Sequence, residues 1–174
     1  MNRTNSNPRT CRAHEPNGFT LMELLIVIAI ILILMLMAIP TIGSLKKSAN
    51  RTSAIQSIRA IQQAEMQYST TYPSNGYACT LAALGGEAGA GAATATSAQL
   101  LQGELTSGFK SGYVFAISNC SKVSANGTDR ITSYTVTAVP QTVGKTGDVG
   151  FCGDDSGPIK QDPTGGSNCT QLVQ

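Results

Sequence analysis

The apolar run from Phe19 to Ile39 constrains this chain more than any other feature. Only Thr20 and Glu23 are polar among its 21 residues. A helix of that length is about 30 Å long, which matches the hydrocarbon thickness of a bilayer. An ordinary secretory signal fits poorly, because the run is longer than a signal's apolar core and no small-x-small cleavage site follows it. We therefore predict a transmembrane or otherwise fully apolar helix over 19–39.

A second helical pattern follows Pro40, which is expected to end or kink the first helix. Apolar residues recur at steps of three and four and predict an amphipathic helix over 40–72. Pro73 and Gly76 then break the pattern. Together the two stretches predict one rod of about 80 Å. The predicted buried stripe, interrupted only at Glu65, is Ile42, Leu45, Ala49, Thr52, Ile55, Ile58, Ile61, Tyr68 and Tyr72.

The remaining sequence predicts a loop and a small sheet. Residues 73–111 are rich in Gly, Ala, Ser and Thr and predict a connection, with one helical hint in "SAQLLQGEL". Residues 112–174 contain strand-like stretches at 112–118 and 131–139, separated by the turn signal Asn126-Gly127. "DVGFC" and "PIKQ" flank "GDDSG" as a second hairpin. The expected fold is α+β, with an antiparallel sheet packed on the amphipathic helix.

Charge and cysteine positions divide the chain at the apolar run. The first 18 residues hold three arginines, one glutamate and the single histidine, His14, whereas the remainder holds nine basic and nine acidic residues. Nucleic-acid binding by phosphate neutralisation is therefore not predicted. Cys11 precedes the run and four cysteines follow it without a CxxC pair. They predict two disulfides in an oxidising compartment rather than a zinc site, with three pairings open.

The segment "GFTLMELLIVIAIILILMLMAIP" resembles the class III signal of type IV pilins and of type II secretion pseudopilins. The resemblance implies a leader at 1–18, with Gly18 as its last residue and Phe19 as the first residue of the mature chain. It implies that prepilin peptidase cuts after Gly18, that the new amine of Phe19 is methylated, and that the subunit leaves the bacterial inner membrane to join a helical filament.

The same resemblance gives Glu23 a role in assembly. A carboxylate inside a membrane costs about 2.5–3.5 kcal/mol on insertion scales. The partner that the resemblance implies is the Phe19 amine of an adjacent subunit. A buried charge pair of this kind fixes the register between subunits more than it adds stability. In the simpler alternative, Glu23 only lies at a helix N-terminus in the headgroup zone. Pro40 and Gly43 are implied to unwind in the filament, or merely mark where the helix leaves the membrane.

The pairings expected for the four cysteines are Cys79–Cys120 and Cys152–Cys169. The second would enclose "CGDDSGPIKQDPTGGSNC", which resembles the disulfide-bounded region of many pilins. Asp154 and Asp155, with Asp148 and Asp162 nearby in sequence, are weak calcium candidates, and exposed turn residues are the simpler interpretation. No cofactor is predicted.

Enzymatic function is not expected, because the chain after Gly18 has no histidine and no recognisable catalytic motif. The preferred function is a type IV pilin that polymerises noncovalently with itself into a surface filament for adhesion, twitching motility or DNA uptake. DNA binding is possible but is not predicted from the charge. The alternative is a pseudopilin of a periplasmic pseudopilus, and a third class is a membrane-anchored binding module. Expected partners are prepilin peptidase, the pilus or secretion machinery and the inner membrane.

Overall fold

The structure is a computed structural model that describes residues 18–87, 89, 91–125 and 127–173, apart from the side chains of 37–41, 125 and 128. The chain divides into two compact units, residues 1–40 and 41–174, and each is described by itself. The predicted leader, apart from Gly18, lies outside the described residues. The elements are α1 (Leu21–Thr71), α2 (Leu81–Leu84), a 3₁₀ helix (Gly103–Ser107), β1 (Phe109–Lys110), β2 (Tyr113–Ala125), β3 (Thr128–Pro140), β4 (Gly150–Asp154), β5 (Lys160–Asp162) and β6 (Gln171–Leu172).

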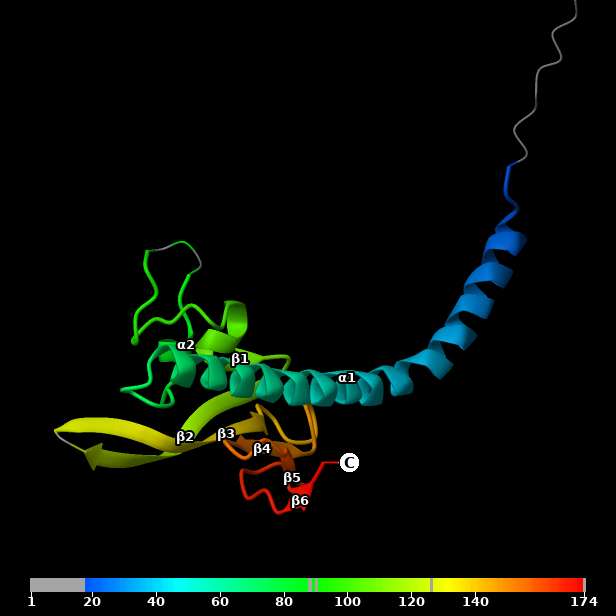
Figure 1. The fold of residues 1–174 in the computed structure, drawn as a ribbon. Helices are drawn as coiled ribbons and strands as arrows, with labels where there is room; N and C mark the ends of the chain where they lie inside the picture. Colours follow the sequence, from blue (N-terminus) through cyan, green and yellow to red (C-terminus); the bar gives the residue numbers. More distant parts are fainter. Residues whose placement is uncertain (1–17, 88, 90, 126, 174) are drawn as a thin grey trace, which may run out of the picture. The chain divides into compact units, whose positions relative to one another are not determined.

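Helix α1 contains both helical stretches that the sequence predicts (Figure 1). Its helical backbone does not end at Pro40, and the kink expected there stays a prediction. The helix ends just before Tyr72, whose amide still donates to the Tyr68 carbonyl at 2.8 Å. Gly76 then turns the chain with a φ of 76°, a conformation that suits glycine because it has no Cβ. Pro73 and Gly76 thus break the helix as expected.

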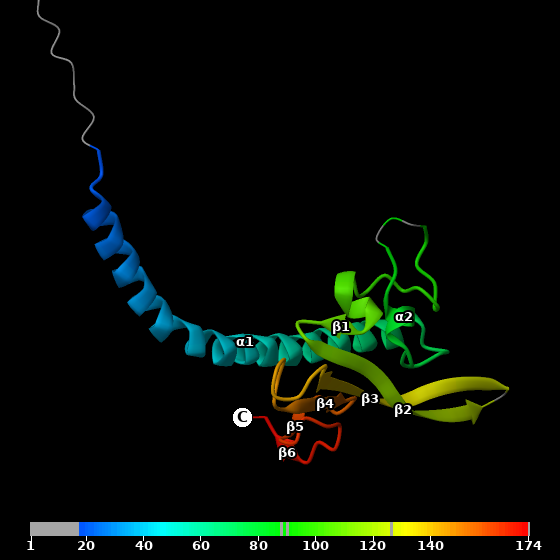
Figure 2. The same ribbon diagram turned by 180° about the vertical axis from the view of Figure 1, so that it is seen from behind.

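The six strands form one antiparallel sheet in the order β1-β2-β3-β4-β5-β6. The long β2–β3 hairpin projects beyond the other strands, as Figures 1 and 2 show. In its body, Val114 pairs with Val139 and Ile117 with Val136, and a register shift follows Ser118. The sequence predicted these two strands but made both too short. It also predicted the β4–β5 hairpin around "GDDSG", where Phe151 pairs with Gln161.

The core of the second unit lies between α1 and one face of the sheet. From Ser133 to Pro140, successive residues of β3 alternate between half-buried and buried, as expected of a sheet with one covered face. Gly153 allows close approach of the helix, because a Cβ there would lie 2.8 Å from Cγ2 of Ile58. The core residues of α1 and the sheet are Ala54, Ile58, Ile61, Ala64, Tyr68, Tyr113, Phe115, Tyr134, Val136, Ala138 and Phe151.

The predicted stripe of α1 is only partly buried. Ile58, Ile61 and Tyr68 are buried as expected. The first four members of the stripe are instead exposed: Ile42, Leu45, Ala49 and Thr52. Among the described side chains of α1, the buried ones begin at Ala54, because the sheet and its loops cover the helix from there onward. Glu65, predicted as the polar interruption, has no exposed surface at all.

Candidate functional site

The start of α1 is held by a reciprocal pair of side chains on Thr20 and Glu23. The Thr20 amide donates to Glu23 Oε2 at 3.0 Å, and the Thr20 hydroxyl donates to the same oxygen at 2.9 Å. In return, the Glu23 amide donates to Thr20 Oγ1 at 3.2 Å. This is a capping box, which satisfies amides that a helix N-terminus otherwise leaves without partners. Glu23 thus has a structural role inside a single chain.

Side chains from Gly18 to Leu36 are all exposed in the isolated chain. Phe19 retains 85% of its surface and Glu23 is also exposed. The large apolar members are Leu21, Met22, Leu24, Leu25, Ile26, Val27, Ile28, Ile30, Ile31, Leu32, Ile33, Leu34, Met35 and Leu36. An apolar surface of this extent on one helix marks a binding surface for other apolar groups.

No helix among the described residues meets the length and hydropathy expected of a membrane span. The transmembrane helix over 19–39 stays a prediction.

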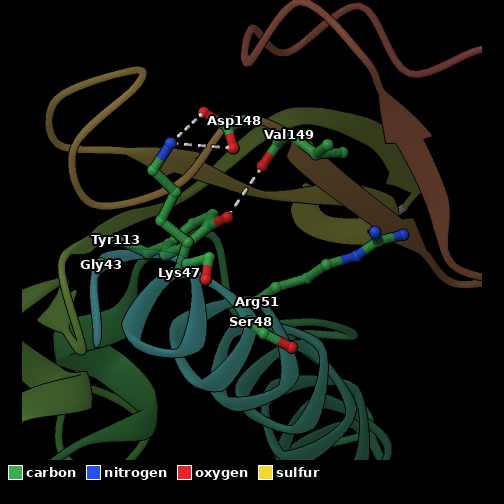
Figure 3. Close-up of a pocket in the computed structure, with 8 residues that line it drawn as sticks. Gly43, Lys47, Ser48, Arg51, Tyr113, Asp148 and Val149 are labelled. Carbon is green, nitrogen blue, oxygen red and sulfur yellow. Dashed lines mark hydrogen bonds and ion pairs between the residues drawn. The ribbon is translucent and has the colours of Figure 1, made fainter. Parts of the chain in front are cut away.

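A hollow of about 450 Å³ in the second unit lies beside the start of its helical part. Figure 3 shows Lys47 reaching Asp148, whose two carboxylate oxygens lie 3.1 and 3.3 Å from Nζ, while Arg51 extends away from this pair. The Tyr113 hydroxyl donates to the Val149 carbonyl at 2.9 Å. Lys47 thus connects α1 to the β3–β4 loop, and Tyr113 connects β2 to the same loop, so both side chains have structural partners.

The predicted calcium candidates do not form an ion site in the described residues, which contain no group of three or more metal-ligating side chains. Asp154 accepts bonds from the amide and hydroxyl of Ser156 and lies 3.7 Å from Lys160 Nζ. Asp162 accepts bonds from the amides of Thr164 and Asn168. Hydrogen bonding to Thr164 and Asn168 lowers the pKa of Asp162. Both side chains therefore stabilise turns.

Two disulfides hold the second unit, Cys79–Cys120 and Cys152–Cys169. These are the pairs expected from the sequence. The first ties the segment after α1 to β2, across 41 residues of chain. The second links β4 to the residues before β6, across 17 residues. Cys11 lies outside the described residues.

The family model that matches the chain covers the start of α1 and not the sheet. Residues 16–39 carry the prokaryotic N-terminal methylation motif. No curated protein and no solved structure matches the chain. The methylation motif includes the capping box of Thr20 and Glu23 and most of the exposed apolar surface.

The methylation motif contains a capping signal that the sequence analysis missed. The pattern Thr20-x-x-Glu23 directly before an apolar run is the signature of a capping box. Gly18, at the start of the described chain, has nothing within 4 Å of the position that a Cβ would take. Packing within the chain therefore does not require glycine there.

Gly43 lies just beyond the methylation motif and is likewise free of packing constraints. Nothing lies within 4 Å of a Cβ built on it, although its backbone is helical. A glycine in an exposed helix costs about 1 kcal/mol relative to alanine. Packing within the described residues does not explain why a glycine stands here. Unwinding of the helix near Gly43 and Pro40 stays a prediction.

Proposed function

We propose that the chain is the precursor of a type IV pilin, a structural subunit rather than an enzyme. In this proposal, prepilin peptidase hydrolyses the bond after Gly18, and the released amine of Phe19 is methylated. The precursor resides in the bacterial inner membrane before it joins a surface filament used for adhesion, motility or DNA uptake. The methylation motif at residues 16–39 carries the proposal.

The exposed apolar half of α1 supports self-assembly as the mechanism. Burying one large aliphatic side chain stabilises an assembly by about 1.5–3 kcal/mol. The large apolar side chains from Phe19 to Leu36 each retain between 44% and 85% of their surface, so much of that gain is still available to association. Helices of other copies supply matching apolar surface without requiring any ligand.

Glu23 is proposed to set the register of assembly. Its capping bonds use Oε2, so the second carboxylate oxygen can accept a bond from the Phe19 amine of a neighbouring copy. The box also fixes the glutamate side chain on the helix before a neighbour arrives. A pre-positioned charge of this kind loses less conformational entropy when it pairs.

A pseudopilin of a type II secretion system carries the same kind of signal, so the motif alone does not separate the two functions. The pilin is preferred because of composition: the chain has no tryptophan and has four cysteines after Gly18. The two functions differ in where the filament lies, outside the cell or in the periplasm.

Two substitutions separate the charge of Glu23 from its capping role. Glu23→Gln keeps a side chain that can complete a capping box but removes the charge. Thr20→Val keeps the charge but removes the hydroxyl that donates to Glu23 and accepts from its amide. Both variants are expressed in cells that lack the native gene, and sheared filament and precursor cleavage are measured by immunoblot.

We expect Glu23→Gln to be cleaved normally and to yield less than a tenth of the native filament. Thr20→Val should assemble at close to the native level, because losing a cap costs about 1 kcal/mol. Native filament yield from Glu23→Gln would remove the assembly role. Loss of filament from Thr20→Val alone would reduce Glu23 to a helix cap.

A further inference from the structure

Glu65 is a buried carboxyl group in α1 that the proposed function does not use. It has no exposed surface. Its Oε2 accepts one hydrogen bond, from the Ala78 amide at 2.7 Å. Its Oε1 has no hydrogen-bond partner in the described part of the chain. A carboxylate left with an unpartnered oxygen is costly to bury, so this position requires an explanation.

The groups around Glu65 do not compensate a negative charge. Burial raises the pKa of Glu65 to about 8, and the bond from Ala78 only partly opposes this. The titratable groups that act on it electrostatically in the described residues are Tyr68, on its own helix, and Tyr134 of β3. Burial raises the pKa of both tyrosines, so both stay neutral when Glu65 titrates. The site therefore favours the protonated acid near neutral pH.

The chain on both sides of Ala78 is bonded to the long β2–β3 hairpin. The Tyr77 amide donates to the Ile131 carbonyl at 3.1 Å, and the Ile131 amide donates to the Asn75 carbonyl at 2.8 Å. Cys79 is joined to Cys120 of β2. This segment, residues 73–80, thus connects the end of α1 to both strands of the long hairpin. The hydrogen bond from the Ala78 amide to Glu65 attaches this segment to the buried side of α1.

We propose that Glu65 is a proton-dependent latch, which holds residues 73–80 against α1 while the acid is protonated and releases them when it loses its proton. The proton goes to solvent, and the carboxylate then needs water at Oε1. Water reaches that oxygen when the covering segment lifts. Lifting frees the backbone groups of Ile131, which turns this part of β3 into an open strand edge.

Gly76 brings the segment into close contact with β3. A Cβ at Gly76 would lie 1.9 Å from the Ile131 carbonyl oxygen. The segment therefore lies directly on the strand in the closed state. A local opening of this kind is detected by hydrogen exchange of the amides that it frees.

The test is amide hydrogen exchange of the full chain in detergent micelles, measured from pH 5 to 9 and corrected for intrinsic exchange. The Glu65 pKa is about 8 in the closed state and close to its ordinary value once the segment opens. Protection of the Ala78 amide should therefore fall about tenfold per pH unit between about pH 5 and 7, and level off above about pH 8. Glu65→Gln, which cannot titrate, should show no such slope. Glu104→Gln, at an exposed acid, should keep the native slope.

Low urea separates a local latch from whole-unit unfolding. Exchange of Ala78 should be insensitive to urea below the unfolding transition, whereas exchange of buried Val136 in β3 should accelerate. An equal urea dependence of the two amides would contradict the latch, as would a native slope in Glu65→Gln. If Glu65→Gln does not fold, carboxyl NMR of the native chain decides, and a Glu65 pKa close to 4.5 overturns the proposal.

Discussion

The two halves of α1 have similar apolar residues but bury them differently. Ile31, in the first half, retains 44% of its surface, whereas Ile58, in the second half, retains none. The second half lies under a sheet that belongs to the same chain, and the first half has no such cover among the described residues. The comparison shows that the second half builds the core of the second unit, while the first half leaves its apolar surface exposed, which is the surface that the proposed assembly would bury.

The largest expected effect on stability comes from removing the Cys79–Cys120 disulfide, which belongs to the unit that contains the second half of α1. Replacing both Cys79 and Cys120 by serine should destabilise the sheet unit by about 4 kcal/mol, because the loop they close is 41 residues long. Urea unfolding followed by tyrosine fluorescence measures this, since all five tyrosines lie between residues 68 and 134. Helical circular dichroism of the apolar half in detergent should persist, and its loss in the same transition would contradict the separation of the two halves.

A matched pair of substitutions gives the next effect. Ile58→Ala should lower the free energy of unfolding by about 3 kcal/mol, because it leaves a cavity at a fully buried position. Ile31→Ala is the same change in the same helix and should leave tyrosine-detected unfolding unchanged while reducing filament yield. Equal destabilisation by the two substitutions would show that the first half also supports the folded subunit.

The smallest effect locates the boundary between the halves. Leu45 lies in the amphipathic stretch of the sequence but retains 66% of its surface. Leu45→Ala should therefore change the free energy of unfolding by less than about 0.5 kcal/mol in the same urea experiment. A cost of about 2 kcal/mol or more would place Leu45 in the core and move the boundary toward Pro40.

The sequence predicted the elements better than their contacts. Helical periodicity predicted the body of α1. Its end was predictable from Pro73 and Gly76, because these residues stop a helix by local backbone chemistry. It could not tell that Leu45 is exposed, since the three- and four-residue steps record one apolar face and not the tertiary layer that covers it. The short strands β1 and β6 were missed because two-residue strands have no detectable alternation.

The candidate site was predictable to a different degree. The positions of Gly18, Phe19 and Glu23 follow from a local motif, which is readable without any structure. The capping bonds between Thr20 and Glu23 were also readable, from the Thr-x-x-Glu spacing. The burial of Glu65 was not, because its contact with Ala78 depends on how residues 73–80 fold back on the helix.

The central claim is that the chain is cut after Gly18 and assembles outside the cell. The most direct measurement is the intact mass of this protein in the filament fraction sheared from cells. The account predicts a chain that begins at Phe19, heavier by one methyl group and lighter by four hydrogens for the two disulfides. A protein that still carries residues 1–18, or a processed one that stays entirely with the cells, would contradict it.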